Sequence, residues 1–143
     1  MSHVRILLVE DSKPLRRENE GALQRAGYEV ICAEDGETAL EMAQEGHPDL
    51  ILLDMILPKM TGPEVLRHLK SEAKTKDIPV VVLSSLSEKN RQKLLEEGAE
   101  DYLEKGALMP MYGLNLLPSA LENVICRINR KRGIPFSSIP VHR

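Results

Sequence analysis

Cysteine and suitably spaced histidine are scarce in this sequence, and their scarcity excludes several kinds of site. Cys32 and Cys126 lie far apart and form no CxxC pair, so neither a disulfide framework nor a zinc site is expected. We predict instead that both are reduced thiols in the core. The histidines show no metal-ligand spacing and are expected at the surface: His3, His47, His68 and His142.

Long apolar runs and glycine pairs are also absent. No segment is long enough to span a bilayer, and the N-terminus "MSHVRILLVEDS" meets a charge too early for a signal peptide, so a cytoplasmic protein is expected. No GxG occurs, so binding of a nucleotide through a glycine-rich loop has no support. The net charge of −3 offers no broad attraction for nucleic acid.

What the sequence does contain is a regular alternation of two patterns. Its 143 residues suit one domain, and the balance of 42% hydrophobic and 29% charged residues is typical of a globular protein. Five short apolar runs alternate with segments of helical period, which indicates repeated βα units and a parallel sheet: "VRILLVE", "YEVICAE", "DLILLD", "IPVVVLSS" and "DYLEK". The third and fourth runs are apolar at consecutive positions, so we expect them to be central strands covered on both faces.

Helices are expected over residues 12–27, 36–46, 62–74 and 87–99. In the first, Ser12 is placed to cap the helix, Pro14 fits its first turn and Gly27 ends it. Five leucines at helical spacing are candidates for the inward faces of the other three: Leu40, Leu66, Leu69, Leu94 and Leu95.

The last helix follows an unusually long loop, because residues 106–117 show no period before Pro118 can occupy a first helical turn. Its apolar stripe consists of Leu117, Leu121, Val124 and Ile128, and basic residues crowd its end before Gly133. We therefore expect one domain over residues 1–133, followed by a tail or linker stub over 134–143. Right-handed crossovers restrict the layout, and a doubly wound five-stranded parallel sheet of order 2-1-3-4-5 is predicted, with helices on both faces.

Polar side chains stand where the predicted strands end. In a parallel sheet these ends share one edge, and strands one and three are neighbours at the switch point where ligands bind. Each acid could be a helix cap or a turn former, but independent caps do not account for the whole set at one edge. The set comprises Glu10 and Asp11 after the first strand, Asp54 after the third, Ser84 and Ser85 after the fourth and Lys105 after the fifth.

Three carboxylates placed so close repel one another unless a divalent cation lies among them, and oxygen ligands suit Mg²⁺. A magnesium ion, an ammonium and a hydroxyl around one carboxylate form a receptor for a phosphoryl group. Asp54 would attack phosphorus in line and become an aspartyl phosphate.

These residues resemble the receiver domains of two-component response regulators, whose fold is flavodoxin-like. The resemblance covers residues 4–105 and rests on "LLVEDS", "DLILLDMILPKMTG", "VVVLSS" and "GAEDYLEKG" at the family's spacing. It implies that a sensor histidine kinase or a phosphotransfer protein donates a phosphoryl group. The implied roles are the acidic pair Glu10 and Asp11, the phosphoacceptor Asp54, the switch hydroxyl Ser84, the aromatic switch Tyr102 and the phosphate-binding Lys105.

The resemblance also implies a ligand set for Mg²⁺: the carboxylates of Asp11 and Asp54, the backbone carbonyl of Ile56, and Glu10 mainly through water. Pro58 and Gly62 match the loop beside the acceptor. The surface formed by helix four, strand five and the last helix would change its affinity for an unknown output protein. Ile56 and Leu86, which flank the path of an attacking water in this family, are apolar and imply slow hydrolysis.

Simpler interpretations stand beside these roles. Tyr102 could be an aromatic at the edge of the core, Ser84 a small residue at a strand end, Lys105 a solvated lysine and Glu10 a partner of a helix dipole.

Two features depart from the family. Gly106 replaces the proline that usually follows the lysine, and only eleven residues follow Arg132, so a single-domain switch is expected. It would catalyse phosphotransfer to its own aspartate and hydrolysis from it, and a turnover enzyme is not expected.

Two other protein classes fit the sequence less well than the switch does. A haloacid-dehalogenase-type phosphatase needs an acid two positions after its nucleophile, where Ile56 stands, and a flavodoxin needs hydroxyls where the loop after strand one has acids. The alternative kept is a DNA-binding or transcriptional module that uses the basic end "CRINRKRG". A phosphorylation-dependent homodimer is also predicted, through the last helix and the charges Lys89, Arg91, Glu97, Glu100 and Asp101.

Overall fold

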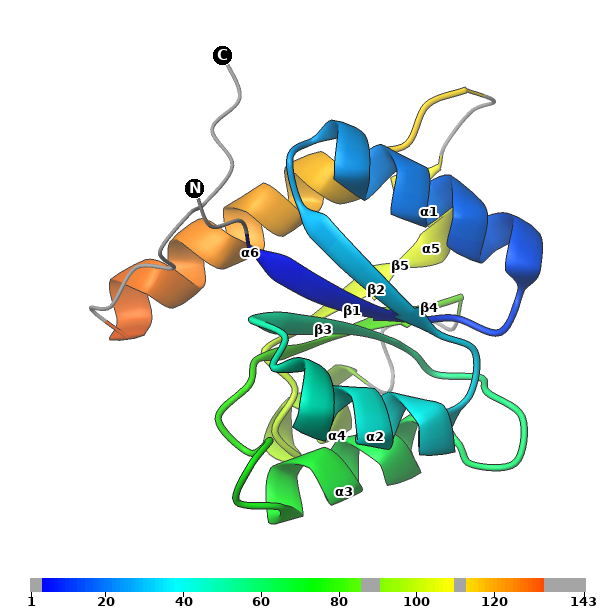
Figure 1. Cartoon of the computed structure of the whole chain (residues 1–143). Coiled ribbons are helices and arrows are strands. Elements are labelled where there is room, and N and C mark those ends of the chain that lie inside the picture. The colour runs from blue at the N-terminus through cyan, green and yellow to red at the C-terminus, as the bar shows by residue number, and fades with distance from the viewer. Residues whose placement is uncertain (1–3, 86–90, 110–112, 133–143) are drawn as a thin grey trace.

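Five parallel strands form the central sheet of the protein, for which the computed structural model describes residues 4–85, 91–109 and 113–132 (Figure 1). The strand order is β2-β1-β3-β4-β5, which confirms the predicted doubly wound topology. Every pair is parallel. The strands are β1 (Arg5–Val9), β2 (Glu29–Ala33), β3 (Leu50–Asp54), β4 (Val80–Ser84) and β5 (Asp101–Glu104).

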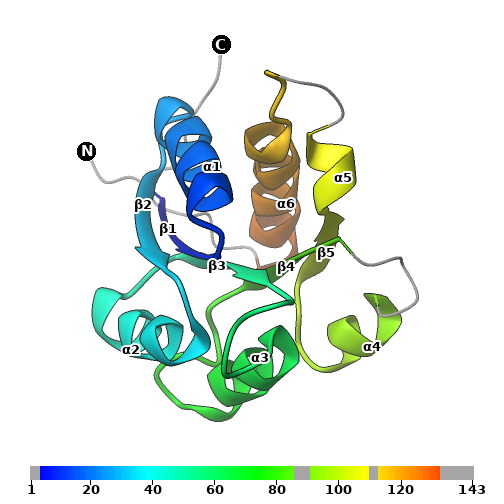
Figure 2. The same cartoon turned by 90° about the vertical axis from the view of Figure 1, so that its right-hand side faces the viewer.

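Helices cover both faces of this sheet, as Figure 2 shows. The helices α1 (Lys13–Arg25) and α6 (Leu117–Arg132) lie on one face. On the other face lie α2 (Gly36–Gly46), α3 (Gly62–Ser71) and α4 (Arg91–Glu96). A one-turn helix, α5 (Lys105–Leu108), follows β5 directly. The predicted start of the fourth helix, at residues 87–90, lies outside the described residues.

The sheet separates two hydrophobic clusters because successive side chains of a strand point to opposite faces. Ile51 and Leu53 of β3 pack in the cluster under α2, α3 and α4, whereas Leu50 and Leu52 pack in the cluster under α1 and α6. All five residues of β3 and of β4 are buried, which confirms that these two strands are central.

Local capping explains where the helices begin. The hydroxyl of Ser12 accepts a hydrogen bond from the backbone N–H of Leu15, and Pro14 lies in the first turn of α1, as the sequence predicted. Thr61 and Glu64 form a capping box at the start of α3, in which each side chain bonds the backbone N–H of the other. This box holds the end of the loop that follows Asp54.

Several sequence predictions need correction. Residues 106–108, expected in an irregular loop, are helical, and Lys105, expected at the end of strand five, begins this helix; Leu108 packs in the cluster under α1 and α6. Cys126 is exposed and Cys32 is only half-buried, so the prediction of two core thiols was wrong. Leu66, Leu69 and Leu94 are fully buried as predicted, whereas Leu40 and Leu95 only pack at the edge of their cluster.

The apolar stripe of α6 is buried along its whole length, which confirms its assignment to the core. The stripe is therefore not available for the contact between two copies that was predicted for it, and Lys89 lies outside the described residues. Arg91 and Arg127, also expected at that contact, pair with Asp101 of the same chain. The homodimer thus stays a prediction without these contacts.

The residue ranges at the ends of the chain stay open. Within the described ranges, no helix is sufficiently long and apolar to cross a membrane. Residues 134–143, predicted to be a tail or linker stub, lie outside the described residues.

Candidate functional site

The carboxyl ends of β1 and β3 bring three acids together at one edge of the sheet. In the register of these neighbouring strands Val9 pairs with Leu53, so Glu10 and Asp54 follow side by side. Glu10 is 1% exposed and Asp54 is 3% exposed, while Asp11 opens to solvent. One carboxylate oxygen of each acid lies within 4.8 Å of the other two, which confirms the predicted cluster.

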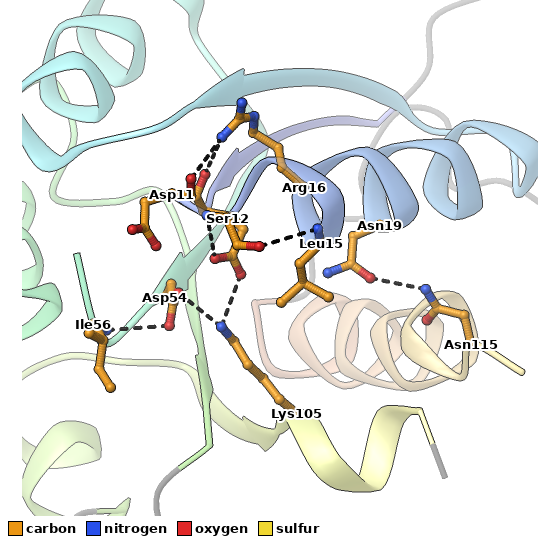
Figure 3. A network of polar contacts seen from close by, with 10 residues as sticks. Asp11, Ser12, Leu15, Arg16, Asn19, Asp54, Ile56, Lys105 and Asn115 are labelled. Carbon is orange, nitrogen blue, oxygen red and sulfur yellow. Dashed lines mark hydrogen bonds and ion pairs between the residues drawn. The ribbon is translucent and has the colours of Figure 1, made fainter. Parts of the chain in front are cut away.

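Lys105, which directly follows the outer strand β5, brings a positive charge to this cluster. Its Nζ lies 2.9 Å from Oε1 of Glu10 and 2.9 Å from Oδ2 of Asp54 (Figure 3). Burial opposes the charge on the ammonium, but the two carboxylates outweigh burial and raise the pKa of Lys105. The alternative of a solvated loop lysine is therefore wrong.

Glu10 is a buried acid whose pKa is raised above its ordinary value. Burial raises the pKa of its carboxyl, and although the ion pair with Lys105 lowers that pKa, the nearby carboxylate of Asp54 raises it further. The backbone N–H of Ser12 donates to Oε2 of Glu10 at 3.2 Å and fixes the second oxygen. The site thus holds more negative charge than one lysine neutralises.

One backbone N–H and the side chain of Lys105 hold the carboxylate of Asp54 in one orientation. The N–H of Ile56 donates to Oδ1 of Asp54 at 3.3 Å, opposite the bond from Lys105 to Oδ2. The side chain of Ile56 is 61% exposed, at the rim of the site. Its backbone carbonyl, the predicted third ligand, lies only two residues after Asp54 in the chain.

The loop after Asp54 returns close to the backbone of Asp54 and Met55 at Gly62. The N–H of Gly62 donates to the carbonyl of Met55 at 2.9 Å. A Cβ at this position would lie 2.6 Å from the carbonyl oxygen of Asp54 and 2.6 Å from Cα of Met55. Only glycine therefore fits here, which gives a physical reason for the match noted at Gly62.

Ser84 and Tyr102 come from the neighbouring strands. Ser84 ends β4 and is buried, and the preceding residue Leu83 pairs with Asp54 in the register. Tyr102 of β5 is buried in the cluster under α2, α3 and α4. This is also the place that a plain core aromatic would occupy, so the switch roles of both residues stay predictions.

Two groups of residues at or near the site were missed by the sequence reasoning. Arg16 donates from Nη1 to the backbone carbonyl of Glu10 at 2.8 Å and to that of Asp11 at 3.4 Å. Its partners are backbone atoms, which no side-chain motif reveals. On α1 one turn further, the buried Asn19 accepts a hydrogen bond from Asn115, a pair separated by 96 residues.

Comparisons with known proteins agree on one family. Residues 6–110 match the family model of the response regulator receiver domain. The chain is 44% identical over 102 residues to the phosphate regulon transcriptional regulatory protein PhoB of Escherichia coli, which covers 71% of this chain and 44% of that protein. It is 42% identical over 123 residues to the gliding motility regulatory protein of Myxococcus xanthus, covering 85% of this chain and 15% of that protein.

A solved structure gives the same result. The chemotaxis response regulator CheY4 of Vibrio cholerae superposes with a TM-score of 0.74 at 31% sequence identity, over 89% of this chain and 99% of that chain. By contrast, this chain spans less than half the length of the two curated relatives named above.

Proposed function

The chain belongs to the response regulator receiver domain family, and from that membership we propose that it is a phosphorylation switch whose acceptor is Asp54. The donor is the phosphohistidine of a sensor histidine kinase or a phosphotransfer protein. The observation that carries this proposal is the ammonium of Lys105 at 2.9 Å from Asp54, within a cluster of three acids.

The proposed reaction is an in-line transfer. An oxygen of the Asp54 carboxylate forms a bond to phosphorus while the bond from phosphorus to the histidine nitrogen breaks, and that nitrogen keeps the electron pair. Lys105 is placed to neutralise an oxygen of the transferred group, since it already contacts the acceptor. Ile56 N–H and Lys105 hold the carboxylate before the donor arrives, which reduces the loss of orientational freedom at reaction.

The acid cluster fits a magnesium ion. Three carboxylates against one ammonium leave an excess of two negative charges, which a divalent cation balances. Asp11, Asp54 and the backbone carbonyl of Ile56 would hold the ion, with Glu10 acting mainly through water. When bound, the ion supplies positive charge for the oxygens of the phosphoryl group.

Output is proposed to follow from the added negative charge. Ser84 ends the strand next to β3, and Lys105 reaches Asp54 from the start of α5. Both would move toward a phosphoryl group, and Tyr102 would follow Ser84. The surface of α4, β5 and α6 then changes its affinity for an output protein, as a shift between two conformations of the chain.

The test of the acceptor uses a small phosphodonor. With acetyl phosphate and Mg²⁺, the wild-type protein is expected to gain one phosphoryl group that is stable to acid and labile to base, measured by intact-protein mass. Asp54→Asn is expected to gain none, because an amide is not a nucleophile at phosphorus. Circular dichroism of the variant controls for folding, and labelling of folded Asp54→Asn at the wild-type level would end the proposal.

A second candidate function is transcriptional regulation. The name of the Escherichia coli relative describes a transcriptional regulator, and the matched part is 44% of that protein. Direct contact of α6 with DNA is the weaker form of this candidate, since Arg127 is paired with Asp101 and the net charge is −3. Salt-independent or absent binding to duplex DNA in fluorescence anisotropy would remove that form.

A further inference from the structure

Asn115, which lies just before α6, is hydrogen-bonded to Asn19 of α1. Nδ2 of Asn115 donates to Oδ1 of Asn19 at 3.0 Å, and the two side chains face each other across the gap between the helices (Figure 3). Oδ1 of Asn115 also accepts a hydrogen bond from the backbone N–H of Leu117 at 2.9 Å and caps α6. We call the pair the Asn19–Asn115 bridge.

Burial makes this bridge hard to break. Asn19 is 5% exposed and lies on the same helix as the buried Ala22 and Leu23. A buried amide that loses its hydrogen-bond partner keeps the cost of its burial without compensation. The Asn19–Asn115 bridge is therefore harder to break than the same pair would be at the surface. The bridge is therefore a fixed link between α1 and the start of α6.

The same link reaches Lys105 through the backbone. The N–H of Leu116, next to Asn115, donates to the carbonyl of Leu108 at 2.7 Å. Leu108 is buried and ends α5, whose first residue is Lys105. At Gly106, among the described residues, no atom lies within 4 Å of the place of a Cβ, so packing at that residue does not position the turn.

Helix α1 thus contacts the backbone of the acids Glu10 and Asp11 and also Asn115, which follows Lys105 in the chain. Arg16 holds the backbone of Glu10 and Asp11. Asn19, three residues later and on the same side of the helix, holds the segment that carries Lys105. The acids and the ammonium are consequently located with respect to one rigid element.

We propose that the Asn19–Asn115 bridge positions Lys105 over Asp54 and so sets the rate of phosphorylation without touching the phosphoryl group. The bridge takes the place of a rigid residue after Lys105, where this chain has the flexible Gly106. This inference rests on the proposed role of Asp54 as acceptor. Asn19 and Asn115 are positioning residues, because they act only through Lys105.

The test removes the bridge and leaves the acids in place. Asn19→Leu keeps an apolar surface against the core and leaves the α6 cap intact. We expect the second-order rate constant for phosphorylation by acetyl phosphate to fall about 10-fold, since small displacements of a charge-stabilising group have large effects. The affinity for Mg²⁺ alone should stay within about twofold of wild type, because β1 and β3 carry the acids. Gln24→Leu, an exposed amide on the same helix, is the matched control and should change neither quantity.

A double-mutant cycle separates positioning from general stability. In a Lys105→Ala background, Asn19→Leu should cause no further loss of rate, whereas independent structural damage would add to the loss. Asn115→Ser, which can still cap α6 but lacks the amide donor, should reproduce Asn19→Leu and serves if Asn19→Leu does not fold.

The outcomes are distinguishable. A wild-type rate for folded Asn19→Leu and Asn115→Ser, or an additive loss in the cycle, overturns the positioning role alone. If Lys105→Ala is itself phosphorylated at the wild-type rate, or Asp54→Asn accepts the phosphoryl group, the proposed function fails instead.

Discussion

At the scale of single residues, the loop that follows Asp54 can return close to its backbone only because residue 62 is a glycine. Gly62 lies where a Cβ would meet the backbone of Asp54 and Met55. Lys59 in the same loop has a φ of 68°, and the N–H of Met60 donates to the carbonyl of Pro58 across it. The loop thus reverses the chain tightly and returns Gly62 to the backbone of Asp54 and Met55.

Substitution of Gly62 tests this close approach. Gly62→Ala must move backbone atoms rather than a flexible side chain, so we expect a loss of about 1–3 kcal/mol in the free energy of unfolding. We also expect slower phosphorylation of Asp54. Urea denaturation measures the first effect, with Gly106→Ala as the control, because a Cβ there meets no neighbour within 4 Å among the described residues. Equal stability of the two variants would contradict the close approach.

Ile56 is expected to influence the rate at which a phosphoryl group on Asp54 is hydrolysed. Its exposed side chain stands at the rim of the site and cannot orient a water for attack on phosphorus. We expect a lifetime of many minutes to hours, and Ile56→Asn should shorten it by about 10-fold because an amide can hold the water. Loss of the phosphoryl group is followed by mass after removal of the donor. Decay of the wild type within seconds in Mg²⁺ buffer would refute this expectation. Leu86, predicted to act with Ile56, lies outside the described residues.

At the scale of the elements, Asp101 joins α4 and α6 at the start of β5. Asp101 is buried, with 7% of the residue exposed. Its carboxylate accepts a hydrogen bond from Arg91 of α4 at 3.4 Å and another from Arg127 of α6. The backbone N–H of Tyr102 donates to Oδ1 of the same carboxylate at 2.7 Å. Asp101 thus links the two helices of the surface that is proposed to change on phosphorylation.

Removal of that acid should loosen the surface without unfolding the protein. We expect Asp101→Ala to lower the free energy of unfolding by about 1–2 kcal/mol, since the side chains of Arg91 and Arg127 are 45% and 54% exposed and remain hydrated. Faster amide hydrogen exchange in α4 and β5 should accompany the loss. The exposed Glu104 offers the control Glu104→Ala. Exchange that is as slow in Asp101→Ala as in the control would show that Asp101 does not join these elements.

At the scale of the whole molecule, the acid cluster links metal binding to folding. The three carboxylates come from β1 and β3 and lie close together only in the folded chain. A cation that binds the folded state alone stabilises it in proportion to the logarithm of its concentration above the Kd.

We therefore expect Mg²⁺ to raise the Tm of the protein in a concentration-dependent way. Asp11→Ala should abolish this rise and leave the Tm in EDTA nearly unchanged, because Asp11 is exposed and removing it loses little packing. Differential scanning calorimetry at several Mg²⁺ concentrations measures both. An equal rise in wild type and Asp11→Ala would place the ion elsewhere.

Much of this protein follows from local patterns in the sequence. Consecutive apolar residues identified β3 and β4 as central strands, and Ser12 marked the start of α1. Because parallel strands end at a common edge, the strand-end residues Glu10, Asp54 and Lys105 could be expected together before any contact was known. The fold and the centre of the site thus depend on periodicity and strand order, which are properties of the sequence itself.

Only the tertiary structure decided which distant residues meet. The partners of Asn115 and Asp101 lie 96 and 26 residues away, and their pairing depends on how α1 and α6 pack on the sheet. The one-turn helix α5 also escaped prediction, because Gly106 is a poor helix former and four residues are too few to form a stable helix alone. In the structure Leu108 packs in the cluster under α1 and α6. Cys126 follows the buried Ile125 in α6, but the next position of a helix points in another direction, so Cys126 is exposed. An apolar residue type alone did not reveal this. Contacts between distant segments arise from packing, which a local pattern does not encode.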